Sequence, residues 1–129
     1  MAAFILDTNV AIHLRDGDPA ISAKVAGLDG AVLLSIVSRV ELEGGVYRDP
    51  ADVAVRRARL DAMLDILPVL DFGAEAAEAY RAIVEAAGYS RRKILDRMIA
   101  AQALAHRATL VTCNPADFQD VPGLTLLAW

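Results

Sequence analysis

The residues best suited to chemistry in this chain are four acidic side chains that lie far apart in the sequence: Asp7, Glu41, Asp96 and Asp117. If the fold gathers these carboxylates at one place, they repel one another and each raises the pKa of the others. A bound divalent cation relieves that repulsion. Because the set offers oxygen ligands and no thiolate or imidazole, it suits Mg²⁺ or Mn²⁺ better than Zn²⁺. The first hypothesis is therefore a metal-binding acidic site.

Asp96 is the hardest of the four to explain as an ordinary residue. Apolar residues follow it three, four and seven positions later, so its side chain shares the apolar stripe of a helix. Burying a carboxylate without a partner is costly. The alternative is an ion pair with Arg92, four residues earlier. A capping role is not expected, because the expected helix cap, Ser90, lies too far ahead of Asp96 in the sequence.

The other three acids have structural alternatives at the starts of helices. Asp7 is placed to cap a helix that begins near Thr8. The run from Ser38 to Glu41 matches a capping box, and Asn114 to Asp117 repeats the logic with Asn114 as the cap. The functional interpretation therefore depends on the four acids in combination.

The elements that would position these acids alternate between strands and helices. Strands are expected at residues 3–6, 31–36, 66–70, 109–112 and 124–127, and helices at residues 9–14, 19–28, 38–45, 50–64, 74–87 and 91–106. The alternation predicts a three-layer α/β/α domain with a mostly parallel sheet of about five strands. Pro68 falls inside the third expected strand, which should therefore be peripheral or irregular.

The predicted sheet also suggests where the acids meet. Ligands of such sheets bind at the carboxyl ends of the strands. Asp7 directly follows the first expected strand, and Asn114 and Asp117 follow the fourth, so both ends should lie on the same edge. Glu41 is followed by Gly44 and Gly45, which leave open space beside it.

Composition narrows the class of protein. The chain has 129 residues, 56% of them hydrophobic, which predicts a single folded domain over residues 1–129. Its apolar runs are far shorter than the roughly 20 residues that span a bilayer, so we expect a soluble protein without a membrane segment. Met1 leads directly into an apolar strand, which predicts no secretory signal. The lone Cys113 fits a reducing cytoplasm, and the distant His13 and His106 exclude a Cys/His metal cluster.

The charge balance limits how the chain can contact nucleic acid. A formal net charge of −4 and a pI near 5.0 argue against a broad basic surface, so any RNA contact must be local. The candidates are the segment 90–93 and the scattered Arg56, Arg57 and Arg59. For each of them, a solvated helix face is the commoner explanation.

Four blocks of sequence resemble a known family. Residues 4–9 (Phe-Ile-Leu-Asp-Thr-Asn) resemble the opening strand and first catalytic aspartate of PIN domains, and residues 34–42 resemble the second block, with its glutamate. Residues 96–101 and 108–118 resemble the third and fourth blocks, and residues 121–124 the usual exit into the last strand. The blocks cover nearly the whole chain in the right order. Within the PIN-domain ribonucleases, the chain is most similar to the VapC toxins of toxin–antitoxin pairs.

The resemblance implies roles for individual residues. Asp7, Glu41 and Asp96 would be metal-binding catalytic acids, with Asp7 and Asp96 as the shared metal ligands. Asp117, or Asn114 through a water, would be the fourth member. The implied reaction is hydrolysis of an RNA phosphodiester by water bound to one or two Mg²⁺ ions, for which Mn²⁺ can substitute. Supporting donors that orient the carboxylates would be Asn9, Thr112 and Asn114. The expected phosphate clamps are Arg91, Arg92 and Lys93.

The resemblance also implies a VapB-like antitoxin as partner and a homodimer. Two positions depart from the family pattern: Ile94, where several relatives carry another acid, and Cys113, where a basic residue is frequent. Glu43 is an alternative to Glu41, although a helix would aim it elsewhere. Two rival functions remain at this point, a flap-nuclease-like DNase that uses the same acids and a catalytically silent α/β binding module whose acids are helix caps.

Overall fold

A parallel five-stranded sheet forms the centre of the molecule, with its strands in the order β3-β2-β1-β4-β5. The computed structural model describes residues 2–129. The strands are β1 (Ala3–Leu6), β2 (Ala31–Ser35), β3 (Val69–Leu70), β4 (Thr109–Thr112) and β5 (Leu126–Ala128). The α-helices are α1 (Thr8–Arg15), α2 (Pro19–Ala26), α3 (Ile36–Val46), α4 (Val53–Ile66), α5 (Ala74–Ala87) and α6 (Ile94–Ala105). The predicted α/β class is confirmed.

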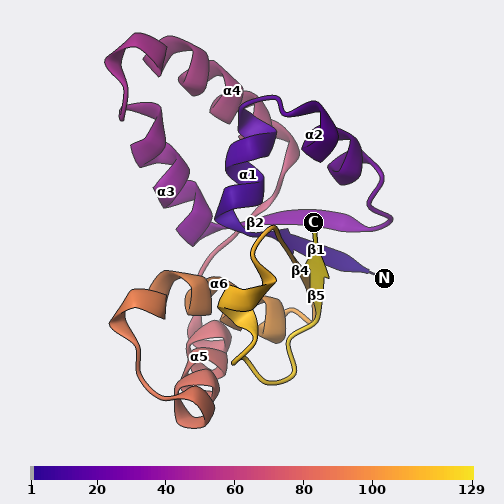
Figure 1. Ribbon diagram of the computed structural model, residues 1–129, viewed down its shortest axis with the longest axis vertical. Helices are drawn as coiled ribbons and strands as arrows, with labels where there is room; N and C mark the ends of the chain where they lie inside the picture. The colour runs from indigo at the N-terminus through magenta and orange to yellow at the C-terminus, as the bar shows by residue number, and fades with distance from the viewer. Residues whose placement is uncertain (1) are drawn as a thin grey trace.

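Helices cover both faces of the sheet, because its central strands are apolar on both sides. Ile5 packs with residues of α5 and α6, whereas its neighbour Leu6 packs with residues of α1, α3 and α4. Leu110 and Val111 of β4 divide in the same way. A strand buried on both faces needs a continuous apolar run, which explains the short hydrophobic segments of the sequence. Figure 1 shows α1 to α4 on one side of the strands and α5 with α6 on the other.

The strand order places a topological switch point between β1 and β4. The chain leaves β1 for β2 on one side of it, and later returns to β4 on the other side. At such a point the flanking connections diverge and leave a crevice at the carboxyl ends of the strands. Asp7 follows β1 at this crevice, and its amide donates a 2.8 Å hydrogen bond to the carbonyl oxygen of Val111 in β4.

Most boundaries differ by a few residues from those expected, and three of these differences are informative. β2 ends at Ser35 and α3 begins at Ile36, because the Ser35 hydroxyl accepts a 3.0 Å bond from the Val37 amide and caps the helix. The expected third strand shrinks to the two residues of β3 at the sheet edge, since α4 continues to Ile66 ahead of Pro68. Its peripheral position was predicted correctly.

The third change bears directly on the site. Residues Arg91–Lys93 form a 3₁₀ turn and α6 begins only at Ile94. Asp96 therefore lies in the first turn of α6, and the expectation that it is too far from the helix start was wrong. A carboxylate at this end of a helix is favoured by the helix dipole.

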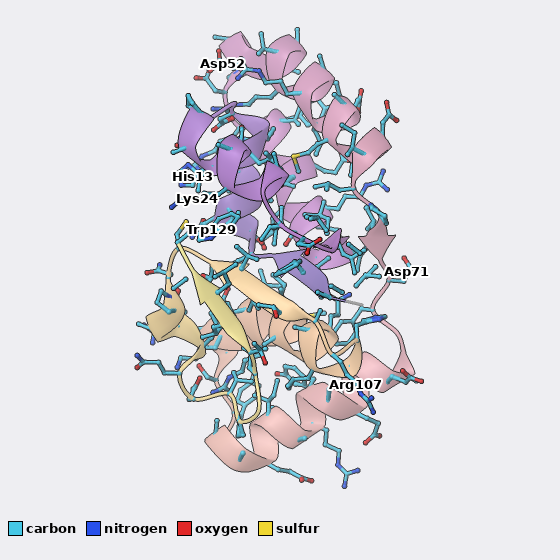
Figure 2. All side chains as sticks on the ribbon, turned by 90° about the vertical axis from the view of Figure 1, so that its right-hand side faces the viewer. His13, Lys24, Asp52, Asp71, Arg107 and Trp129 are labelled. Carbon is cyan, nitrogen blue, oxygen red and sulfur yellow. The ribbon has the colours of Figure 1, made fainter. Side chains whose placement is uncertain are left out.

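The last residue of the chain packs back on the first half of the fold. Lys24 Nζ of α2 lies 5.8 Å from the centroid of the Trp129 ring, and the two side chains are neighbours in Figure 2. The Trp129 amide also donates to the carbonyl oxygen of Thr112 at 2.9 Å. Within residues 2–129, each helix is too short or too polar to cross a bilayer.

Candidate active site

Asp7 is the most firmly held of the four acids. It caps α1, with Oδ1 accepting from the Thr8 amide at 2.8 Å, and Oδ2 accepts from the Thr112 hydroxyl at 2.9 Å. The side chain is 4% exposed, and burial raises its pKa, an effect that the bonds from Thr112 and Thr8 oppose. The Thr112 hydroxyl in turn accepts from the Asn114 amide at 2.9 Å. The capping interpretation of Asp7 is confirmed, and the same carboxylate faces the switch-point crevice.

Glu41 reaches the same region from α3, through a chain of hydroxyl groups. Its Oε1 accepts a 2.9 Å hydrogen bond from the Thr8 hydroxyl. That hydroxyl has one proton to give, so the buried Ser38 hydroxyl, 2.8 Å away, donates to Thr8. The capping box between Ser38 and Glu41 is absent from the described chain, because Ser35 is the cap. Glu43 instead pairs with Arg39 and Arg57.

The Asp96 side chain makes no hydrogen bond or ion pair with residues 2–129, so the alternative of a pair with Arg92 was wrong. Its pKa is raised to about 6, mainly by burial and additionally by the charges of Asp7, Asp117 and Glu41, in that order. These three contributions show that all four acids are close enough to interact electrostatically. The charged form of a half-buried carboxylate that lies near three other acids is destabilised, and a bound cation would relieve that destabilisation.

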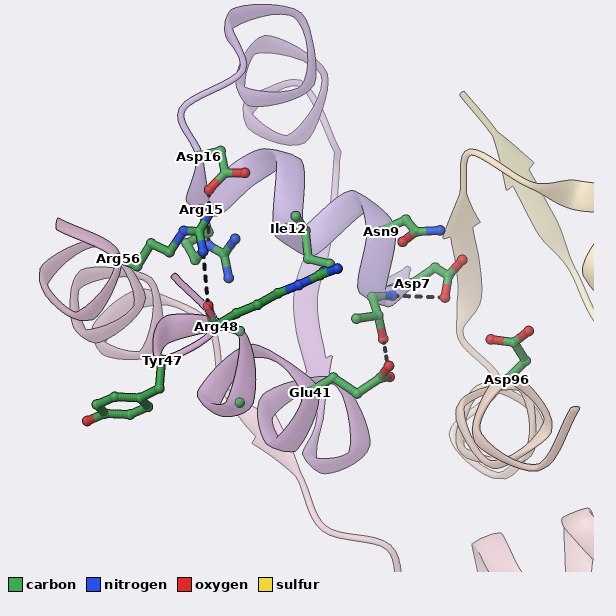
Figure 3. A pocket seen from close by; sticks show the side chains of 13 residues that line it. Asp7, Asn9, Ile12, Arg15, Asp16, Glu41, Tyr47, Arg48, Arg56 and Asp96 are labelled. Carbon is green, nitrogen blue, oxygen red and sulfur yellow. Dashed lines mark hydrogen bonds and ion pairs between the residues drawn. The ribbon is translucent and has the colours of Figure 1, made fainter. Parts of the chain in front are cut away.

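A cavity of about 650 Å³ connects three of these acids, and Figure 3 shows them around it. Its lining includes Asp7, Glu41 and Asp96. Asp96 also lines a second, smaller hollow together with Asp117. The sequence-predicted acids therefore come from four separate segments to two adjoining hollows.

The remaining predicted site residues occupy different positions around these acids. Asn9 lines the larger cavity, but its side chain makes no hydrogen bond to a carboxylate within the described residues. Asn114 precedes the 3₁₀ turn Pro115–Phe118, where its side chain makes no capping bond, contrary to the capping interpretation. Arg92 and Lys93 line the smaller hollow beside Asp96.

The predicted phosphate clamps are not equally available. Arg91 and Arg92 are exposed. The Lys93 ammonium donates a 2.9 Å bond to Asp120, which also accepts from Arg97 at 2.9 Å. Contact between Lys93 and a phosphate would therefore compete with the Asp120 pair.

Several residues that matter at the site were missed in the sequence. Thr8 and Ser38 orient Glu41, and Gln102 joins three elements behind the site from a fully buried position on α6. Its side-chain amide donates to the carbonyl oxygens of Leu70 and Asp71 at 3.1 and 3.2 Å, and its oxygen accepts from the Ser35 hydroxyl. A buried Gln inside an apolar helix run was the available signal, because such a group must be hydrogen-bonded.

The donor chemistry at this site fits a hard divalent cation. The side chains around the larger cavity and its neighbour offer carboxylate oxygens, and the Asp96 carboxylate makes no hydrogen bond or ion pair within residues 2–129. In the described chain, no three Asp, Glu, His or Cys side chains are gathered tightly enough to hold an ion as they stand. Binding would thus require the Asp96 side chain to turn inward toward the firmly held Asp7.

Comparisons with known proteins agree with this geometry. A family model described as "PIN domain" matches residues 4–124. The protein named ribonuclease VapC2 from Rickettsia felis is 28% identical, with 98% of this chain and 97% of the relative covered. Ribonuclease VapC1 from the same organism is 30% identical, with 95% and 93% covered.

Solved structures give the same answer for the fold. The Rickettsia felis VapBC2 structure, bound to a promoter DNA fragment, superposes with a TM-score of 0.84 at 27% identity and covers 98% of both chains. The DNA-bound VapBC structure from Salmonella typhimurium gives 0.86 at 25% identity, with 100% of this chain and 99% of the other covered. Nucleases of the matched family generally depend on a metal ion. From its four acids, its sheet order and these relatives, the chain belongs to the PIN-domain family, in its VapC ribonuclease branch.

Proposed function

We propose that this protein is a Mg²⁺-dependent endoribonuclease and the toxin of a VapBC-type toxin–antitoxin pair, with residues 1–129 acting as one domain in the cytoplasm. One observation carries the proposal. Asp7 and Asp96, which come from opposite ends of the sequence, line the same cavity at the switch point of the sheet, and Asp7 is among the charges that raise the pKa of Asp96. Such a perturbed acid in a cavity is typical of a functional site.

In this mechanism Asp7 and Asp96 hold the metal, and Glu41 and Asp117 complete the acidic surround. When bound, Mg²⁺ would lower the pKa of a water molecule and offset the negative charge on the phosphoryl oxygens. Mn²⁺ can substitute for Mg²⁺. Thr112 and the Thr8 amide keep Asp7 in one orientation, and the Thr8 hydroxyl holds Glu41 toward the cavity. Partial burial strengthens these interactions because it removes competing water.

RNA as substrate and an antitoxin as partner are supported by the relatives. Two are named ribonuclease VapC, and a third, from Shigella flexneri, is named tRNA(fMet)-specific endonuclease. Two similar structures are VapBC complexes bound to DNA. An uncontrolled ribonuclease would damage its own cell, so a cognate VapB-like antitoxin that blocks this site is part of the proposal.

A homodimer is supported by an apolar surface between α3 and α6. Val40 and Leu95 are 65% and 48% exposed, although both are large and hydrophobic. They line a hollow of about 310 Å³ together with Ile36 and Met98. Contiguous exposed apolar side chains favour an interaction between proteins, and a second copy is the partner that we propose for them.

The test compares RNA and DNA of one sequence, with tRNA as a further substrate, before and after Mg²⁺ is added to chelator-treated protein. Wild type should cut RNA only with the metal. Asp7→Asn and Asp96→Asn should fold and lose at least about a hundredfold in activity, because each removes a charge that the metal needs. Asp65→Asn, an equal change on the exposed surface of α4, should retain full activity.

Three outcomes would contradict the proposal. Full activity in both site variants would remove the acids from the mechanism. Cleavage of DNA at the same rate as RNA would favour the flap-nuclease-like alternative. Absence of any metal-dependent cleavage, with no effect of Mn²⁺ on thermal unfolding, would favour a silent binding module.

A further inference from the structure

The larger cavity has a basic end that the acidic mechanism does not use. Beyond Asp7, Glu41 and Asp96, its lining continues to Arg15 of α1, Arg48 after α3, and Arg56 of α4. Figure 3 shows Asp7 and Asp96 on one side of the view and Arg15 and Arg56 on the other, within one cavity. A ligand that fills the cavity therefore meets carboxylates at one end and guanidinium groups at the other.

Arg15 is the anchor of this basic end. The residue is only 6% exposed, and the single hydrogen bond of its side chain among residues 2–129 runs from Nε to Oδ1 of Asp16 at 3.1 Å. The two terminal nitrogens of its guanidinium make no hydrogen bond within that part of the chain, and the residue lines the cavity. These donors are therefore held in place and free to bind a ligand that enters the cavity, which would replace the water there.

Gly45 makes room for the Arg15 guanidinium against α3. A Cβ atom at this position would lie 3.1 Å from Nη1 of Arg15, closer than ordinary van der Waals contact. The carbonyl oxygen of Gly45 accepts a 3.2 Å bond from Nη1 of Arg56. A side chain at position 45 would therefore disturb the contact between α3 and the guanidinium of Arg15.

The other two arginines complete the basic end. Arg56 is half-buried, and its second terminal nitrogen lies 4.0 Å from Asp52, so that pair is weak. Arg48 is exposed, and its side chain makes no hydrogen bond or ion pair inside the described chain. In Figure 3 its long side chain extends toward Ile12 across the cavity. Asp16 is the one acidic residue at the basic end of the cavity, and its carboxylate forms an ion pair with Arg15.

We propose that Arg15, Arg48 and Arg56 form a phosphate subsite, which binds a backbone phosphate of the RNA strand away from the phosphate that is cleaved. The inference rests on the proposed ribonuclease function. Guanidinium groups match phosphate in charge and in hydrogen-bond geometry. Asp96 lines both hollows, so a strand that passes it reaches this subsite from one hollow and Arg92 with Lys93 from the other.

An acidic peptide is the other ligand with suitable charge for the three arginines. RNA is favoured because the two ends of the cavity then serve one ligand. Its scissile phosphate must approach Asp7 and Asp96 for cleavage, and the adjacent backbone carries further phosphates along the same cavity. A peptide carboxylate gains from the arginines alone and has no group that needs to reach the acids at the other end.

The binding experiment uses a labelled, unstructured 20-nucleotide RNA in chelator, which prevents cleavage. Arg48→Gln and Arg56→Gln should each weaken binding roughly three- to tenfold at low salt. The slope of log affinity against log salt concentration should become shallower by about 0.7 for each lost phosphate contact. The matched control is Arg81→Gln, an exposed arginine of α5 that pairs with Glu78 and Glu85 and should bind as wild type does.

Cleavage provides a second measure that a structural effect would not reproduce. With Mg²⁺, Arg48→Gln should raise KM for the long RNA and leave kcat unchanged, and it should leave cleavage of a dinucleotide unaffected, since that substrate has no neighbouring phosphate. Arg15→Lys, which keeps the charge but loses the planar fork, should also weaken long-RNA binding. Thermal unfolding of each variant checks that it folds.

The outcomes separate this inference from the proposed function. If wild type cleaves RNA but Arg48→Gln and Arg56→Gln bind it with unchanged affinity and salt slope, the subsite is refuted and the ribonuclease stands. If wild type cleaves no RNA but its RNA binding depends on these arginines, the phosphate subsite is supported and the proposed ribonuclease function is refuted. Tighter, arginine-dependent binding of an oligoglutamate peptide than of RNA would also overturn the phosphate assignment.

Discussion

The hydroxyl of Thr8 donates a 2.9 Å hydrogen bond to Oε1 of Glu41 and so connects the start of α1 to the middle of α3. The amide of the same residue donates to Asp7 at 2.8 Å. Thr8 therefore sets the relative orientation of two acids that belong to different segments. Supporting hydrogen bonds of this kind fix the direction in which a carboxylate presents its free oxygen atoms to a metal.

Thr8→Val should lower kcat of the Mg²⁺-dependent reaction roughly 10- to 100-fold, because Glu41 loses its fixed orientation. It also leaves the fully buried Ser38 hydroxyl without its partner, which should reduce the free energy of unfolding by about 1–3 kcal/mol. Kinetics and urea unfolding measure the two effects. Thr8→Ser keeps the hydroxyl and should stay near wild type in kcat; an equal loss in both variants would refute the hydrogen-bond role.

Mg²⁺ or Mn²⁺ should raise the melting temperature of chelator-treated protein, because an ion that binds only the folded state stabilises it. At ten times the dissociation constant the gain is about 1.4 kcal/mol, a shift of a few degrees for a chain of this size. Asp96→Asn should abolish most of the shift and Asp65→Asn should preserve it. An identical rise in wild type and Asp96→Asn would show that the ion binds elsewhere.

The raised pKa of Asp96 predicts a pH dependence of stability in the absence of metal. Its pKa is about 6 in the folded protein and near 3.8 in the unfolded chain, so the folded state holds this proton more tightly. Between these two values, stability must fall as pH rises, and the penalty is complete above pH 6. Allowing for partial exposure, the loss is about 1–2 kcal/mol.

Asp96→Asn removes that charge. The variant should therefore unfold at a higher urea concentration than wild type at pH 8 in chelator, and the difference should shrink toward pH 4. Added Mg²⁺ should make wild type the more stable of the two proteins at pH 8, since the Asp96 carboxylate then binds the cation. Parallel stability curves for the two proteins from pH 4 to 8 would contradict the assigned perturbation.

Gln102→Leu should reduce the free energy of unfolding by about 2–4 kcal/mol, because the buried Ser35 hydroxyl and the carbonyl oxygen of Leu70 lose a partner. Urea unfolding measures this. In a double-mutant cycle with Ser35→Ala, the combined loss should be smaller than the sum, since both changes break one bond. Strict additivity, or a loss below about 0.5 kcal/mol for Gln102→Leu alone, would show that the network contributes little.

Much of the fold was predictable because the apolar runs and their separators are local properties. Residues 3–6 and 109–112 were placed at the same bounds that the structure shows, since short buried strands stand out between charged segments. The start of α6 could not be predicted, because the residues of the 3₁₀ turn Arg91–Lys93 are equally common in α-helices. The turn differs from an α-helix only in its backbone conformation. The capping role of Ser35 was hidden in the same way by the apolar residues that surround it.

What the sequence determined by itself is the set of acids and their order, because residue type and strand position are written locally and parallel strands present their carboxyl ends at one edge. Only the tertiary structure decided which groups face one another. Arg15, for example, is an ordinary helix residue in the sequence, and it becomes a buried donor only because α3 packs against it at Gly45. Burial and the distances between charges are properties of packed elements, so the basic end of the cavity and the raised pKa of Asp96 arise only when the chain folds.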